Sequence, residues 1–180
     1  MTPTATPSPA PSPAPCTVRP AGHGDLLAVL GVHARRDPGG EPPGSATPRE
    51  EAAWQRMVRS PDVTVYCAEV DGGVVGTATL TVLPNVAYRD CAPSAVIEAV
   101  VVAHQHRRRG VATEIVRRAL ADARAAGCDK VQVVSHKRHA TDGAHSLYAG
   151  LGFVPEAEGF RLYLRRSPAA GSAAGTVSPS

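Results

Sequence analysis

Short runs rich in β-branched residues, several of them with alternating polar positions, recur along the chain and predict β-strands. These runs cover residues 17–19, 63–70, 74–83, 95–102 and 130–135. The second and third runs are joined by Asp71-Gly72-Gly73, which is typical of a tight hairpin because these residues tolerate positive φ angles. We therefore expect these two runs to pair as antiparallel strands.

Apolar residues spaced three and four positions apart predict helices between the strands. The predicted helices cover residues 24–35, 47–59, 111–126 and 142–151. The second helix begins with a capping signal, because Thr47 can accept from the N–H of Glu50 while Pro48 occupies the first helical position. We expect its apolar side to be buried, namely Trp54, Met57 and Val58.

The helix over residues 111–126 has the clearest two-sided pattern. It stops at Gly127, a residue that readily adopts the left-handed conformation common after a helix. Charged residues occupy one side and apolar residues the other, as expected for a helix that packs on a core. The predicted buried side comprises Val111, Ile115, Val116, Ala119, Leu120 and Ala123.

The two ends of the chain differ from its middle. Residues 1–15 and 167–180 are rich in proline, alanine and serine, so they cannot bury enough apolar surface to order themselves. We therefore predict one domain over residues 16–166, with the element order β-α-α-β-β-β-α-β-α-β-β. The last two strands form a closing hairpin over residues 152–154 and 160–164.

Three consecutive arginines, Arg107 to Arg109, and then Gly110 separate the strand over 95–102 from the next helix. The first N–H groups of a helix lack partners and carry partial positive charge, so cations there are unfavourable unless an anion binds. Gly110 and the small Ala112 leave room for a close ligand. The turn predicts a phosphate or pyrophosphate site, although arginine-rich turns also occur on surfaces that bind nothing.

This segment resembles the pyrophosphate motif Q/R-x-x-G-x-G/A of the GNAT family of acyl-CoA-dependent N-acyltransferases, here Arg107-Arg108-Arg109-Gly110-Val111-Ala112. The family's second landmark is similar to Leu147-Tyr148-Ala149-Gly150-Leu151-Gly152-Phe153, about 40 residues later. The resemblance covers residues 16–166 and implies an α/β GNAT fold, with helices on both faces of a mixed, largely antiparallel central sheet. It also implies direct transfer of an acetyl group from acetyl-CoA to a primary amine of a small molecule, in a ternary complex.

The resemblance implies a site for acetyl-CoA as co-substrate. The turn would hold the pyrophosphate, the strand before it would pair with the pantetheine arm, and a strand N–H would polarise the thioester carbonyl. Many family members use an asparagine on pantetheine, but residues 138–144 contain none, so Thr141 or Asp142 replaces it or the contact is absent. The implied cofactor-binding residues are Val100, Val101, Val102, Arg107, Arg108, Arg109, Gly110, Val111, Ala112, Thr113 and Tyr148.

Glu98 is the only charged residue in the strand over 95–102. Alternation places it on one face with Val96, Val100 and Val102, where desolvation would suit a carboxylate to take a proton from the amine. We expect Glu98 to act as the base through a water molecule, or else to hold the acceptor or the local structure without moving a proton. His136, at the end of the next strand, is the alternative base or a solvated loop histidine.

Tyr148 resembles the family tyrosine that protonates the departing CoA thiolate. A phenol has a pKa of about 10 and a thiol one of about 8.5, so this proton transfer is favourable once the thiolate forms. The alternative is that Tyr148 is a core tyrosine on a short helix, with its hydroxyl bonded to a structural partner. The two candidate catalytic residues are therefore Glu98 and Tyr148.

The acceptor pocket is expected where three segments meet in the resembling fold: the loop between the first two helices, the loop over 84–94 and the closing hairpin. The arginines in these segments indicate an acidic or phosphorylated amine. The candidate acceptor residues are His33, Arg35, Arg36, Tyr88, Arg89, Glu98, His136, Phe160 and Arg161.

Composition limits the other functions. A formal net charge of +3 is too small to indicate a nucleic-acid binder, and no aromatic residues are interleaved with the basic loops. The four cysteines and seven histidines lack metal-ligand spacing, so we predict free thiols, no metal and a reducing, cytoplasmic location. No run approaches the roughly 20 apolar residues of a membrane span. The main alternative is a non-catalytic acyl-CoA sensor or interaction module, and whether the chain forms a homodimer is left open.

Overall fold

The computed structural model describes residues 16–86, 89–135 and 143–157, and beyond them Gly159, Leu162 and Leu164. Within these residues the elements follow the predicted order as far as the last helix. They are β1 (Thr17–Pro20), α1 (Leu26–Ala34), α2 (Pro48–Arg59), β2 (Val63–Val70), β3 (Gly73–Leu83), β4 (Ser94–Val102), α3 (Val111–Ala125), β5 (Lys130–Val133) and α4 (Ala144–Gly150). Short 3-10 turns are η1 (His23–Asp25), η2 (Arg89–Cys91) and η3 (His104–His106).

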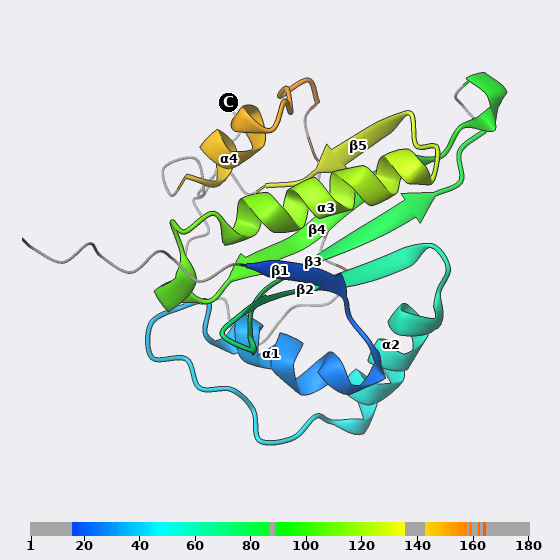
Figure 1. Ribbon diagram of the computed structural model, residues 1–180. Helices are drawn as coiled ribbons and strands as arrows, with labels where there is room; N and C mark the ends of the chain where they lie inside the picture. Colours follow the sequence, from blue (N-terminus) through cyan, green and yellow to red (C-terminus); the bar gives the residue numbers. More distant parts are fainter. Residues whose placement is uncertain are drawn as a thin grey trace, which may run out of the picture.

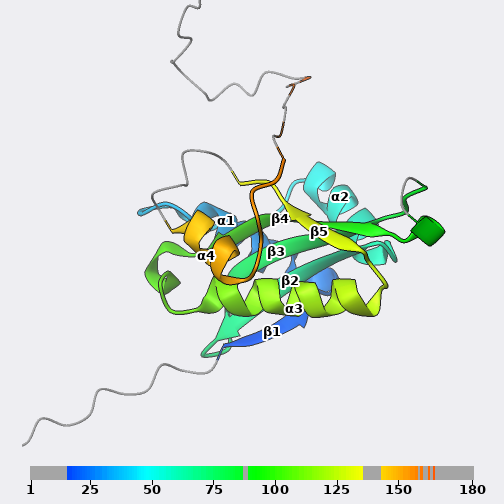
Figure 2. The same ribbon diagram turned by 90° about the horizontal axis from the view of Figure 1, so that it is seen from above.

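The five strands form one sheet in the order β1-β2-β3-β4-β5. Neighbouring strands are antiparallel except β4 and β5, which are parallel. Figure 1 shows α1 and α2 on one face of the sheet and α3 on the other. Figure 2 shows α4 beside the start of α3. The predicted α/β class, with a mixed and largely antiparallel sheet between helices, is confirmed.

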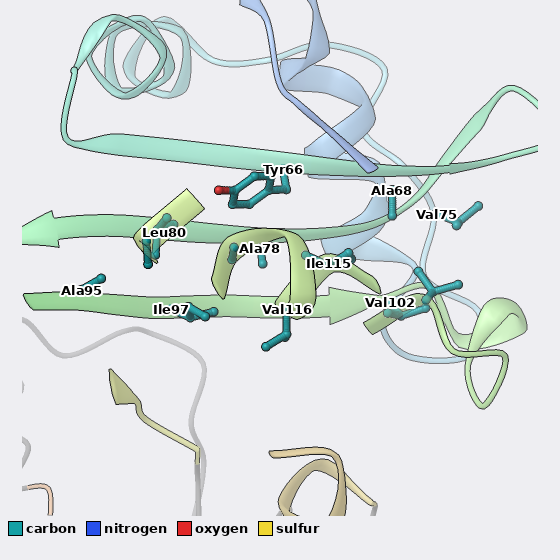
Figure 3. Close-up of a cluster of buried hydrophobic side chains, with 13 residues drawn as sticks. Tyr66, Ala68, Val75, Ala78, Leu80, Ala95, Ile97, Val102, Ile115 and Val116 are labelled. Carbon is teal, nitrogen blue, oxygen red and sulfur yellow. The ribbon is translucent and has the colours of Figure 1, made fainter. Parts of the chain in front are cut away.

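The larger hydrophobic core lies between the sheet and α3 (Figure 3). Ile115 of α3, Ile97 of β4 and Tyr66 of β2 are completely buried in it. Each large apolar side chain buried in this way stabilises the fold by about 1.5–3 kcal/mol, so this core fixes α3 firmly against β4. The predicted buried side of α3 is confirmed, with Val111, Ile115, Val116, Ala119 and Ala123 buried and Leu120 half-buried.

A smaller core holds α1 and α2 on the opposite face. It contains Val29, Trp54, Val65 and Cys67, and the Trp54 indole N–H donates to His23 O at 3.1 Å. Met57 and Val58 pack against this core, as the sequence predicts for the apolar side of α2.

Three local predictions are confirmed. The Thr47 N–H donates to Glu50 Oε2 at 2.7 Å, and the Glu50 N–H donates to Thr47 Oγ1 at 3.3 Å, which completes the cap of α2. Between β2 and β3, Asp71 and Gly72 have φ angles of 52° and 74°, the left-handed pair that a tight hairpin requires. The four cysteines are free thiols.

The segment after α4 differs from the prediction. Within the described residues, the strand expected over 152–154 is absent. Gly152 has a φ of 89°, and the Phe153 N–H donates to Tyr148 O at 3.0 Å. These features terminate a helix, so Phe153 belongs to the end of α4 and not to a strand. The other half of the expected hairpin lies largely outside the described residues, as do both predicted tails.

Candidate active site

Strand β4 carries one extra residue where it passes β3. Thr79 pairs with Glu98, but two residues earlier on β3, Thr77 pairs with Val101. One residue of β3 therefore faces two residues of β4. Ala99, inside this interval, has a φ of 50°, a left-handed value that residues other than glycine rarely adopt. This β-bulge shifts the side-chain alternation of β4 by one position.

The bulge overturns the expected position of Glu98. Strict alternation would place Glu98 on one face with Val100 and Val102, but those valines pack with Ile97 in the core beneath α3. Glu98 pairs with Thr79 on the opposite face, and it is exposed. The prediction that these valines desolvate the carboxylate is therefore wrong, because the bulge separates its side chain from theirs.

A groove opens where β4 and β5 separate. The two strands pair only from Ser94 opposite Lys130 to Ile97 opposite Val133. β5 ends there, two residues before its predicted end, whereas β4 continues to Val102. A groove of about 810 Å³ occupies the gap, with walls from β4, the turn before α3, the residues after β5 and α4.

The groove collects most of the residues that the sequence assigned to cofactor and catalysis. Glu98 and Tyr148 both line it, so the two candidate catalytic side chains border one space. Arg109 is exposed and is not part of its wall. The expected cofactor residues in the wall are Val100, Val101, Val102, Arg107, Arg108, Gly110, Val111, Ala112, Thr113 and Tyr148.

The start of α3 has the geometry of an anion site. Gly110 has a φ of 82° immediately before the helix, and no side chain of the described residues caps this end. The first helical hydrogen bond runs from the Glu114 N–H to Gly110 O at 3.1 Å. The N–H groups of residues 111–113 therefore have no helical acceptor, and they lie beside the groove at the positive end of the helix dipole.

The first two arginines of the turn have different surroundings. Arg107 donates from Nε to Val102 O at 3.2 Å and from Nη2 to Arg36 O at 2.6 Å. Arg108 has a φ of 61°, and its guanidinium packs on Gly143, where an added Cβ would lie 2.5 Å from Nη1. Arg107 is thus held at the ends of β4 and α1, while Arg108 reaches the start of α4.

Tyr148 is half-buried on α4, between the larger hydrophobic core and the groove. Its ring packs edge-on against Phe153, with ring centroids 5.8 Å apart, and it borders the larger core. The same residue lines the groove. The contact with Phe153 holds the ring, and Tyr148 is part of the groove wall.

Several acceptor candidates are not brought to the groove. His33 lines neither the groove nor a smaller cavity of about 360 Å³ beside η3. Although His33 is exposed, nearby protein atoms desolvate its ring and Arg36 repels its charged form, so its pKa is lowered. Arg35 lines the smaller cavity, and Arg36 lines the groove. The remaining candidates lie outside the described residues, namely Tyr88, His136, Phe160 and Arg161, together with Thr141, Asp142 and the side chain of Arg89.

Part of the groove wall escaped the sequence analysis. Ser135, Ser146 and Leu147 line the groove. Leu147 belongs to the second family landmark and Ser146 precedes it, so the landmark could have indicated both. No sequence signal marks Ser135. Among the described residues, no three His, Cys, Asp or Glu side chains are grouped to hold a metal, and no helix has the length and apolarity to span a membrane.

The comparisons with known proteins agree with this geometry. A sequence model of the acetyltransferase (GNAT) family matches residues 32–153. A protein of Agrobacterium tumefaciens str. C58, assigned as an acetyltransferase, is 33% identical with a TM-score of 0.72, covering 82% of this chain and 99% of that one. A glucosamine-6-phosphate N-acetyltransferase of Arabidopsis thaliana is 17% identical with a TM-score of 0.67, covering 84% and 99%. An aminoglycoside N-acetyltransferase in complex with CoA is 19% identical with a TM-score of 0.65, covering 88% and 99%.

These matches carry different weight. The latter two structures support the fold alone because their sequence identity is low, and no curated protein sequence matches the chain. The family match spans more than half of the chain and includes both the arginine turn and Tyr148. It therefore covers the two sides of the groove from which the cofactor site was predicted. The chain belongs to the acetyltransferase (GNAT) family.

Proposed function

We propose that the protein is an acetyl-CoA-dependent N-acetyltransferase that acts on a primary amine of a small molecule. The groove between β4 and β5 carries this proposal, because it joins an uncapped helix start to a wall that contains Glu98 and Tyr148. Family membership supports the same activity. The amine attacks the thioester directly in a ternary complex, with no covalent enzyme intermediate.

Acetyl-CoA occupies the groove lengthwise in this proposal. Its pyrophosphate binds the N–H groups at the start of α3, where the helix dipole favours an anion, and Arg108 adds a positive charge at the same end. The pantetheine arm follows residues 100–102, of which Val101 and Val102 pair with β3 on one edge, and all three extend past the end of β5 on the other. That edge offers backbone groups to the amides of the arm, as an exposed strand does to an added strand.

The chemistry assigns one task to each group. The amine nitrogen forms a bond to the thioester carbon while the carbon–sulfur bond breaks. Glu98 takes the proton of the amine through a water molecule, a route that its exposed position in the groove allows. A β4 N–H polarises the carbonyl, and Tyr148 gives its proton to the thiolate. The products are the acetylated amine and CoA.

The acceptor is proposed to be a small amine, and two of the structural neighbours guide the first probes. One is named for glucosamine 6-phosphate and another for aminoglycosides. Arg36 and Glu98 line the groove with opposite charges, which suits an acceptor that carries an amine and an anionic group. Arg36 also contacts Asp37, with Nη2 to Oδ2 at 3.0 Å, so an anionic acceptor competes with that surface pair.

The test measures release of the CoA thiol from acetyl-CoA in the presence of single amines. The panel contains glucosamine 6-phosphate, kanamycin, spermidine and a peptide with an N-terminal alanine. At least one amine should raise thiol release roughly tenfold or more over the rate without amine. CoA binding without stimulation by any amine would reject the transferase and favour a non-catalytic CoA-binding module. Failure to bind CoA would reject both the transferase and the non-catalytic CoA-binding module.

A further inference from the structure

Arg107 lies where three segments of the chain meet. Its guanidinium donates to Val102 O at the end of β4 at 3.2 Å, and to Arg36 O just past the end of α1 at 2.6 Å. Nearby, the His104 N–H donates to Arg35 O at 2.9 Å. The turn before α3 is therefore bonded twice to the segment after α1, although Arg36 and Arg107 are 71 residues apart.

Charge explains why Arg107 adopts this position. The start of α3 is the positive end of a helix and disfavours a cation, whereas the end of α1 is a negative end whose last carbonyls lack helical partners. The Arg107 side chain extends away from the start of α3 and donates to Arg36 O, just past the end of α1. Its Nε and Nη2 groups are engaged by carbonyl oxygens, so a phosphate that used them would have to break these two bonds.

Arg107 holds residues 35–41, which lie on the side of the groove where the acceptor amine is proposed to bind. Arg36 lines the groove together with Glu98. Residues 37–41 then pass beside a second cavity of about 360 Å³, whose other wall includes residues 103–106, namely Ala103 after β4 and the turn η3. The cavity separates the segment from η3 at this point, and the hydrogen bonds at Arg35 and Arg36 join the two. The hydrogen bonds to Arg35 O and Arg36 O therefore set the position of residues 35–41 relative to the groove.

We propose that Arg107 is a positioning residue that holds the segment 35–41 against the cofactor groove, and that it is not a pyrophosphate ligand. The proposal rests on the function proposed above. In this proposal, neighbouring residues of the turn have different roles. Arg108 and the N–H groups of α3 bind the cofactor, and Arg107 sets where the acceptor amine meets the thioester.

The test compares hydrogen exchange of the backbone amides over residues 35–41 in four proteins. These are the wild type, Arg107→Ala, Arg107→Lys and the control Arg124→Ala, which removes an exposed arginine of α3 outside the groove wall. Without ligand, both Arg107 variants should exchange roughly tenfold faster in this segment, measured relative to β2, and the control should match the wild type. Lysine does not restore protection, because a single ammonium does not reproduce the fork that reaches two carbonyls.

Binding and kinetics complete the test. The dissociation constant of CoA by calorimetry should stay within roughly threefold of the wild type in all variants. With the best amine of the panel, Arg107→Ala should raise KM for the amine roughly tenfold. Loss of CoA affinity that Arg107→Lys restores, with unchanged exchange, would make Arg107 a phosphate ligand and overturn the proposal. Unchanged exchange and unchanged KM would overturn it as well. If the wild type does not bind CoA, the proposed function fails, while the ligand-free exchange data still decide whether Arg107 holds the segment.

Discussion

Arg108 packs on Gly143 so closely that a Cβ added to the glycine would lie 2.5 Å from Arg108 Nη1. The turn before α3 thereby contacts the start of α4, which is the helix that carries Tyr148. Gly143 also has a φ of 92°, a conformation that glycine adopts readily. The proposed cofactor end of the groove and the proposed acid are therefore joined through one guanidinium.

A double-mutant cycle tests this contact. Gly143→Ala should lower the free energy of unfolding by about 1–2 kcal/mol because of its positive φ, and weaken CoA binding roughly tenfold because the methyl group displaces Arg108. Arg108→Ala should weaken CoA binding to a similar extent. In the double variant the two losses of affinity should not add, since the methyl group then displaces nothing. Calorimetry measures this, and additive losses would contradict the contact.

Substitutions at Ala99 test the bulge in β4. Ala99→Val places a β-branched side chain at a φ of 50°, which should lower the free energy of unfolding by about 1–2 kcal/mol. Ala99→Gly accepts this φ and should leave stability unchanged or slightly higher. Ala99 is exposed, so lost packing contributes little. Urea unfolding measures both variants, and equal effects would argue against the left-handed conformation.

The buried Tyr66 predicts a loss of stability in alkali. Burial, and then the hydrogen bond from its hydroxyl to Asp122 Oδ2 at 2.7 Å, raise the pKa of Tyr66. The folded state therefore keeps the proton longer than the unfolded chain, whose tyrosines have a pKa of about 10. The contribution is complete below about pH 10 and is lost as the pH rises above it.

Tyr66→Phe removes this titration together with the hydrogen bond. At neutral pH it should lower the free energy of unfolding by about 1–2 kcal/mol. Above about pH 10 the difference between the two proteins should shrink, because only the wild type loses the tyrosine contribution. Denaturant unfolding at several pH values checks the trend, and a constant difference would contradict the role of the Tyr66 hydroxyl.

Tyr148→Phe separates catalysis from packing. The phenylalanine keeps the ring contact with Phe153 and removes only the hydroxyl. We expect kcat to fall by a factor of about 100–10,000, while the dissociation constant of acetyl-CoA changes less than about threefold. Steady-state kinetics and calorimetry measure the two quantities. An equal loss of kcat and of affinity for acetyl-CoA would mean that Tyr148 has a packing role and that another group protonates the thiolate.

The sequence predicted the features that depend on neighbouring residues. The cap of Thr47, the turn at Asp71-Gly72 and the apolar side of α3 are local patterns, and each has the predicted form. The bulge at Ala99 depends on how β4 pairs with β3, and a run of valines gives no sign of it. For that reason the burial of Glu98 was predicted wrongly.

The different surroundings of the arginines in the turn also depend on distant parts of the chain. One of the two carbonyls that accept from Arg107 belongs to Arg36, just past the end of α1, and the glycine in contact with Arg108 lies at the start of α4. In sequence these arginines are equivalent neighbours. Only the folded chain brings their partners together, so the sequence predicted a cofactor site at this turn but did not distinguish the surroundings of its arginines.

Acetyl-CoA is proposed to bind in the groove with its pyrophosphate at the start of α3, and Thr113→Glu tests this position most directly. A glutamate at the third helical position is favourable near a helix start and can bond back to the unpaired N–H groups, so the fold is preserved while a carboxylate takes the pyrophosphate position. The control is Ala121→Glu, at an exposed site on the same helix. Titration calorimetry with acetyl-CoA should give similar dissociation constants for the wild type and the control, and a roughly thirtyfold higher one for Thr113→Glu, equivalent to about 2 kcal/mol. Undiminished binding by Thr113→Glu would contradict this position of the cofactor.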